Sequence, residues 1–243
     1  KDEIFGHVAS YYIVQLYYLQ KKYDSVIALA PALLDSASTK RATELTRIIG
    51  ESYYNTAKYK EAIPYLKKYK DAVGEVTRDD YYQLGFAYYK TNEYTDALIN
   101  FIKSNTGDED ELAQNAAYHI GDCYLKTGQK TKALQAFKKA SKLKFDQSIV
   151  EDALFNYAKL CYETSNNPNN SAINALKNYI NKYPGTDRTD EAYTYLVNAF
   201  TTTKSYEEAL TAIDNIKTLT PDLKLAYQKA AYFGSIERFN NID

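Results

Sequence analysis

The sequence contains little of what most catalytic and metal sites require. Its 243 residues include two cysteines and two histidines, with no tryptophan and no methionine. We expect Cys123 and Cys161 to be buried thiols in different structural units, because two cysteines are too few for a disulfide framework. His119 and Cys123 are four residues apart, a spacing that can share a metal on a helix, but no further ligand pair completes such a site. Glycine motifs of nucleophile elbows and phosphate loops are absent, so we expect no enzymatic activity, no metal and no cofactor.

Other scarce features limit which folds and which classes of partner are possible. Nine glycines and five prolines are few for an all-β chain that needs many turns. No apolar run approaches the ~20 residues that a membrane-spanning helix needs. The net charge of -1 provides no global attraction to nucleic acid or to an anionic membrane. Seven lysines lie between Lys126 and Lys144, but we interpret them as the solvated face of an outward helix, and nucleic acid is not expected as a partner.

One motif recurs along nearly the whole chain. It consists of an apolar residue, a small residue, two variable residues and a tyrosine, as in Ile49-Gly50-Glu51-Ser52-Tyr53. Its small residue returns every 35 to 39 positions and defines what we call the small column: Val14, Gly50, Gly85, Gly121, Ala158 and Val197. Alanine usually follows twelve residues later and a large apolar residue four after that, as in Ala62 with Leu66 and Ala97 with Phe101. Six copies in one frame indicate a repeat protein.

This motif resembles the tetratricopeptide repeat, in which an apolar-Gly-x-x-Tyr segment is followed by Ala, Phe and Pro every 34 residues. The resemblance extends over nearly the whole chain. The sequence departs from the signature in its slightly longer period, in the lack of a leading Trp, and in a terminal Pro in only two copies, Pro184 and Pro221. The resemblance implies an all-α fold, a right-handed superhelical solenoid of stacked helix-turn-helix units.

We predict a single solenoid over residues 1–243. Its expected boundaries are six repeats at about 7–40, 43–74, 78–105, 114–145, 151–184 and 190–221, and a half repeat at 222–243. We interpret each repeat as two helices. The small residues of the small column on the first helix and of the alanine position on the second allow neighbouring helices to approach closely. One hairpin cannot bury its apolar face alone, so stacking supplies the core. The terminal half repeat suggests part of a longer array.

Turn and cap residues predict where the helices end. Lys21–Asp24, Thr91–Tyr94, Lys126–Gln129 and Thr203–Tyr206 are expected to be turns within repeats, and a longer turn is expected at 166–170. Ser205 with Glu208 can form a capping box. The acidic run Asp108–Glu111 is expected at a helix N-terminus, where negative charge is favourable. Pro64 is placed near the first turn of its helix, while Pro184 and Pro221 are expected to end second helices.

First helices line the concave face of such solenoids, so the resemblance directs attention to their exposed stripe. That stripe contains the residues three before, one after and four after the small column. It is rich in aromatic residues interleaved with single charges, and tyrosine is well suited to partner recognition. The candidate partner-binding residues are Tyr11, Tyr18, Arg47, Glu51, Tyr54, Tyr82, Phe86, Tyr89, Tyr118, Asp122, Phe155, Lys159 and Tyr162. The same rings could equally fill a wide groove floor without binding anything.

These features favour a non-catalytic scaffold that binds a protein or peptide partner. Two alternatives remain open: a docking or regulatory region of a larger enzyme, and binding of a small ligand or glycan by the tyrosines. A receptor for chaperone tails is not expected, since Tyr and Phe occupy the positions where that class uses Lys. Similarity to bacterial cell-envelope proteins with tetratricopeptide repeats implies a periplasmic or outer-membrane-associated location.

Overall fold

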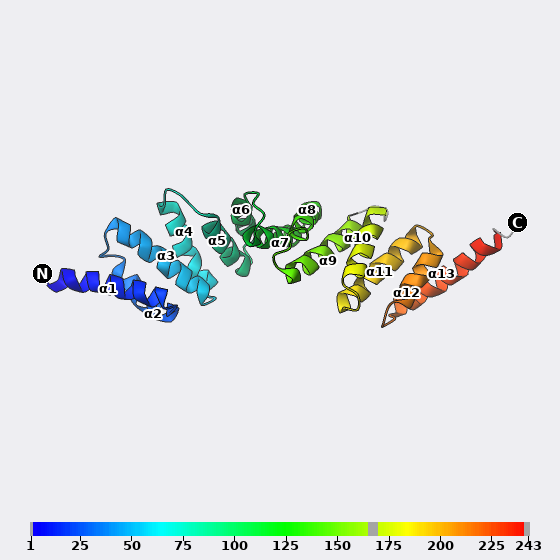
Figure 1. The fold of residues 1–243 in the computed structure, drawn as a ribbon, viewed down its shortest axis with the longest axis horizontal. Coiled ribbons are helices and arrows are strands. Elements are labelled where there is room, and N and C mark those ends of the chain that lie inside the picture. Colours follow the sequence, from blue (N-terminus) through cyan, green and yellow to red (C-terminus); the bar gives the residue numbers. More distant parts are fainter. Residues whose placement is uncertain (1, 165–169, 241–243) are drawn as a thin grey trace. The chain divides into compact units, whose positions relative to one another are not determined.

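A computed structural model describes residues 2–164 and 170–240, with the side chains of residues 2–8 and 187 left undescribed. The described residues form α-helices and one short 3-10 helix, with no strand among them (Figure 1). The all-α helical-repeat architecture is therefore confirmed. By their internal contacts the residues divide into two compact units, residues 1–108 and 109–243, which we describe separately.

The first unit contains six helices in three pairs. Their bounds are α1 Asp2–Leu19, α2 Tyr23–Leu29, α3 Thr39–Asn55, α4 Tyr59–Ala72, α5 Arg78–Lys90 and α6 Tyr94–Ser104, with the 3-10 helix at Pro31–Leu33. Each helix packs against the next one in sequence, and α1 also packs against α3. The core between them is apolar and includes Val14, Val26, Leu45 and Ile49 around α1 to α3.

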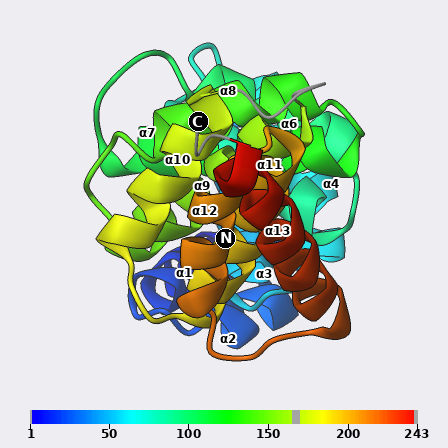
Figure 2. The same cartoon turned by 90° about the vertical axis from the view of Figure 1, so that its right-hand side faces the viewer.

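The second unit contains three further pairs and a final helix. Their bounds are α7 Glu111–Lys126, α8 Lys130–Ala140, α9 Gln147–Glu163, α10 Asn170–Lys182, α11 Asp187–Thr202, α12 Tyr206–Asp214 and α13 Pro221–Asn240. The first helices contact one another in succession, α7 with α9, α9 with α11 and α11 with α13. Figure 2 shows α13 lying against α11 and α12. Such stacking gives each pair the apolar cover that it lacks by itself.

The small column is packed inside the helix pairs, and at its three glycines the two helices of a pair approach closely. All six of its residues are buried. A Cβ atom added to Gly121 would come within 2.9 Å of the Phe137 ring, and one added to Gly50 would come within 3.0 Å of the Leu66 side chain. The glycines therefore admit a large apolar side chain from the second helix of the same pair. This is the packing that the repeat pattern predicts.

A left-handed residue closes the turn within five of the pairs. It is the seventh residue after the small column, with φ between 57° and 76°, and the five are Lys21, Ala57, Asn92, Gly128 and Lys204. The four predicted turns within repeats are confirmed, and each contains one of these residues. Only one of the five is a glycine, although left-handed backbone costs other L-residues energy. The longer turn predicted at 166–170 lies almost wholly outside the described residues.

Helix ends follow the sequence expectations in part. Asp110 caps α7 by accepting a hydrogen bond from the backbone N–H of Ala113, which confirms the interpretation of the acidic run. Ser205 is the N-cap residue of α12, but its side chain makes no capping bond, so the predicted capping box is wrong. Its hydroxyl instead forms a hydrogen bond with the Thr203 hydroxyl at 3.2 Å.

Two proline placements are also wrong. Pro64 lies inside α4 rather than near its first turn. Pro221 is the first residue of α13, seven positions beyond the end of α12 at Asp214. A proline is well tolerated at the start of a helix because it has no N–H to leave unsatisfied. Pro184 follows the end of α10 at Lys182, as expected.

Candidate partner-binding surfaces

The candidate residues lie on first helices, with α1, α3 and α5 in the first unit and α7 and α9 in the second. Most are half-buried, which leaves part of each side chain accessible. Glu51 and Phe155 are the exceptions, at 9% and 6% exposed. These two residues expose too little surface to contact a partner extensively, and their main role is to hold neighbouring side chains in place.

The first unit has a continuous group of rings on α3, α5 and the helices that follow them. We call this group the aromatic cluster, and it contains Tyr54, Tyr59, Tyr82, Phe86, Tyr89 and Tyr94. Phe86 is central, with ring centroids 5.9 Å from Tyr54, 5.7 Å from Tyr59, 6.1 Å from Tyr82 and 6.2 Å from Tyr89. Tyr94 joins through Tyr89 at 5.9 Å. These separations are favourable for aromatic pairs, so the rings hold one another in place.

The cluster combines apolar area with neutral polar groups and one cation. Burial is the main factor that raises the pKa of Tyr54 to about 12, and burial also raises the pKa of Tyr82. Both phenols are therefore neutral at physiological pH and can donate hydrogen bonds. The Lys90 ammonium lies 5.6 Å from the Phe86 ring centroid and 6.0 Å from that of Tyr59, which adds a cation at the rim.

A polar network joins α1 to α3 next to the cluster. Arg47 donates to Glu44 at 2.7 Å and to Glu51 at 3.0 Å, and the Tyr18 hydroxyl donates to Glu51. Burial and the Glu51 carboxylate raise the pKa of Tyr18 to about 12. The hydrogen-bonding groups of this network satisfy one another. It therefore fixes the two helices together and presents few unsatisfied donors or acceptors.

Tyr11 occupies the far end of the same stripe on α1. Its hydroxyl accepts a hydrogen bond from Gln15 at 2.9 Å, and the Arg41 guanidinium lies 5.4 Å from its ring centroid. It is half-buried and has no described contact with the aromatic cluster.

The second unit links its first helices through charged groups. Asp152 on α9 accepts from the Tyr118 hydroxyl on α7 and pairs with Arg188 on α11. The Arg188 guanidinium lies 5.5 Å from the Phe155 ring centroid, and Phe155 also packs edge-on against Tyr179. These contacts explain why Phe155 is almost fully covered.

A second link in this unit involves Lys159. Its ammonium donates to Glu191 on α11 at 3.0 Å and lies 5.5 Å from the ring centroid of Tyr195. Tyr195 packs against Tyr162, with ring centroids 5.2 Å apart. Asp122 is half-buried on α7. The candidates thus form an aromatic cluster beside a polar network in the first unit, and a charged set, linked by ion pairs, in the second.

Sequence reasoning missed several residues of these sets. Tyr59 and Tyr94 belong to the aromatic cluster, and each is the ninth residue after the small column. Tyr23 and Tyr206 occupy the same register, so a periodic signal was present. Asp152, Arg188 and Glu191 carried no such signal, because their importance comes from pairing between helices, with partners 32 to 36 residues apart in sequence.

Comparison with known proteins identifies the repeat family. Models described as tetratricopeptide repeat match residues 115–147 and 152–186. These two segments are tetratricopeptide repeats. No curated protein matches the sequence.

Solved structures share the fold, among them one described as a tetratricopeptide-repeat protein. YrrB, described as having an unusual peptide-binding site, has a TM-score of 0.57 at 16% identity, covering 82% of this chain and 98% of its own. MamA has a TM-score of 0.53 at 20% identity, covering 78% of this chain and 96% of its own. At these identities the likeness shows the fold alone. Among the described helices, none is both long and apolar enough to cross a membrane.

Tetratricopeptide-repeat proteins are generally non-catalytic interaction scaffolds, and the repeat fold found here supports that role. Protein or peptide partners are the class that such a fold recognises. Both described cysteines are buried free thiols, as expected.

Proposed function

We propose that this protein is an interaction scaffold that binds a protein or peptide partner on the faces of its first helices. The aromatic cluster of the first unit is the main anchor. The observation that supports this most is the grouping of six half-buried rings with Phe86 at their centre and the Lys90 cation at their rim. Aromatic side chains already held in place lose little entropy on binding, and they dominate the energetics of many interfaces.

The charged set of the second unit has a different part in this proposal. Its carboxylates and cations are already paired, so recruiting them would break existing bonds. Rim charges of this kind affect specificity and association rate more than affinity. The partner therefore docks by apolar and aromatic side chains on the first unit.

Site-specific photo-crosslinking tests the proposed surface without removing any packed ring. Benzoylphenylalanine replaces Tyr89 or Tyr94 in the cluster, and Lys67 on the exposed face of α4 in the control. The three variants are incubated with lysate from the source organism and irradiated. We expect the same partner to be captured at both cluster positions and not at the control position.

Purified partner then allows the affinity to be measured. The triple change of Tyr54, Tyr82 and Tyr89 to Ala should weaken binding at least tenfold, since interface tyrosines often contribute 1–2 kcal/mol or more. Circular dichroism must show that the variant remains helical. Equal capture at all three crosslinking positions, or unchanged affinity of a folded triple variant, contradicts the proposal.

A further inference from the structure

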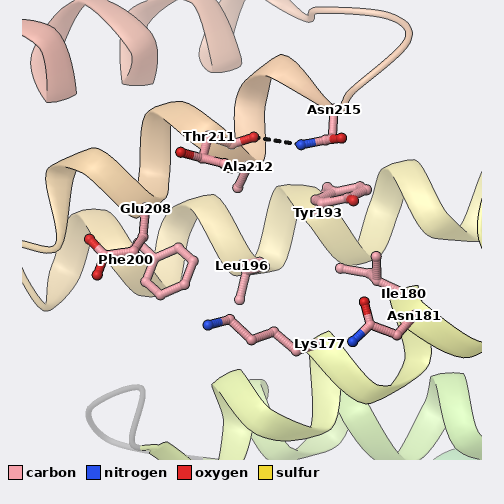
Figure 3. A pocket seen from close by; sticks show the side chains of 10 residues that line it. All are labelled: Lys177, Ile180, Asn181, Tyr193, Leu196, Phe200, Glu208, Thr211, Ala212 and Asn215. Atoms are coloured by element: carbon pink, nitrogen blue, oxygen red, sulfur yellow. Dashed lines mark hydrogen bonds between the residues drawn. The ribbon is translucent and has the colours of Figure 1, made fainter.

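The second unit has a slot on the opposite side of its helix pairs, between the second helices α10 and α12. Figure 3 shows the side chains that line the slot, with α11 crossing between α10 and α12. The cavity has a volume of about 290 Å³. A cavity of roughly half this volume binds benzene when its lining is apolar. The slot is therefore large enough for one large apolar side chain and part of the backbone that carries it.

The floor of the slot is apolar. Leu196 and Phe200 of α11 form it, with Ile180 of α10 and Ala212 of α12 at its sides. All four are 4% to 6% exposed, so the little surface that they retain faces the slot. An apolar group that entered the slot would cover this surface without displacing any core side chain.

The walls of the slot are polar and carry opposite charges. Lys177 and Asn181 line it on α10, while Glu208 and Thr211 of α12 and Asn215, directly after the end of α12, line the other wall. The Lys177 ammonium lies 5.3 Å from the Phe200 ring centroid, which holds this cation above the floor. Glu208 is exposed in the first turn of α12.

We propose that this slot is a second binding site, specific for an extended peptide that carries a large apolar side chain next to an acidic residue. The apolar side chain lies on Leu196 and Phe200, and the acidic residue faces Lys177. The Asn181 amide can donate to and accept from a peptide backbone, whose groups an extended segment leaves unpaired. The Asn215 amide nitrogen already donates to the Thr211 carbonyl at 2.7 Å, so Asn215 offers mainly its side-chain oxygen as an acceptor. Alternate side chains of an extended peptide point to opposite sides, so the acidic neighbour stays at the solvated rim, where Lys177 lies.

The two wall charges should affect the binding affinity in opposite directions. Lys177 attracts the acidic residue of the peptide, and Glu208 on the other wall repels it. Removing the lysine charge should weaken binding, whereas removing the glutamate charge should strengthen it. Because both groups are near the surface, each effect is expected to be about two- to fivefold.

The test uses the full chain labelled with nitrogen-15 and three capped peptides, Gly-Asp-Phe-Gly, Gly-Asn-Phe-Gly and Gly-Asp-Ala-Gly. Amide chemical shifts are followed during titration. The phenylalanine peptides should shift the amides of Leu196, Phe200 and Ala212, with the Asp form binding two- to fivefold more tightly than the Asn form. The alanine peptide should produce no saturable shift.

Variants connect the binding to the slot. Thr211→Trp fills the slot from its rim and should abolish the shifts, while Asp214→Trp, on an exposed position of the same helix outside the slot, should leave them unchanged. Lys177→Gln should weaken binding of the Asp peptide and Glu208→Gln should strengthen it. The charge variants keep the test valid if Thr211→Trp fails to fold.

Shifts that survive in folded Thr211→Trp, or that spread away from α10 to α12, overturn the proposal. So do charge variants that both change affinity in the same direction. The readout is confined to the second unit and does not use the aromatic cluster. Failure here is therefore distinct from failure of the proposed function.

Discussion

Gly121→Ala provides the sharpest test of how the repeats pack. The new Cβ would lie 2.9, 2.9 and 3.0 Å from three ring carbons of Phe137, closer than real Cβ contacts. Phe137 is 1% exposed, and its ring packs against Tyr118 with centroids 5.7 Å apart, so it has little room to move. Overpacking a core costs about 1–3 kcal/mol. Replacing a helical glycine by alanine gains about 0.8–1 kcal/mol.

The net expectation for Gly121→Ala is a loss of about 1 kcal/mol of unfolding free energy, measured by urea denaturation. Phe137→Leu removes the ring that the new methyl group meets. In that background Gly121→Ala should be neutral or stabilising, which gives a coupling energy of about 1–2 kcal/mol between the two sites. Gly234→Ala is the matched control, because the nearest atom to its added Cβ is a single side-chain carbon at 3.3 Å.

The control should show most of the helix-propensity gain. If Gly121→Ala stabilises the protein as much as Gly234→Ala does, and does so with or without Phe137, the close approach of the two helices is refuted. The repeat argument would then lose its physical basis, because the small column would have no steric role.

The remaining predictions concern a cap, a turn and the pH dependence. Thr77→Ala should lower the free energy of unfolding by about 1 kcal/mol, because the capping box of α5 is lost. Ser205→Ala should change the free energy of unfolding little, because Ser205 is an N-cap without a capping bond. An equal loss in both variants contradicts this. Ala57→Gly should raise the free energy of unfolding by about 0.5–1 kcal/mol in urea denaturation, because glycine adopts the left-handed backbone without strain. Gly128→Ala should lower it by about 1 kcal/mol for the converse reason. The opposite pattern would refute the turn geometry. Burial raises the pKa of Cys123 to about 12 from 9.0, so the unfolded chain loses this proton first and stability should fall as pH rises from 9 toward 12. A Cys123→Ala variant should show a smaller fall in the same denaturation experiment.

Prediction from sequence worked where the determining contacts are local. The glycines at 50, 85 and 121 recur because each faces a large residue sixteen positions later, within one helix pair. The tight turn seven residues after the small column also recurs, because it joins the two helices of a single pair. A period of this kind is visible in the sequence, since both partners lie in the same repeat.

The caps show where local patterns stop being sufficient. Ser205 and Glu208 have the spacing of a capping box, yet Thr77 with Asp80 and Thr186 with Thr189 form the capping boxes of α5 and α11. Ser205 ends a tight turn with φ −83° and ψ 69°, whereas Thr77 and Thr186 have extended backbone. The backbone that enters the helix decides the cap, and that backbone depends on how the preceding helix packs.

The sequence by itself determined the helical class, the repeat register and the residues of the small column, because short-range spacing encodes them. Only the tertiary structure decided which candidate side chains remain available. Phe155 is covered by Tyr179 and Arg188 from the helices that follow α9, and Glu51 is held by Tyr18 from α1 as well as by Arg47 of its own helix. The slot over Phe200 likewise exists only because α10 and α12 come to flank α11. Such features depend on where separate helices meet in space, and the periodic pattern of the sequence does not reveal where that is.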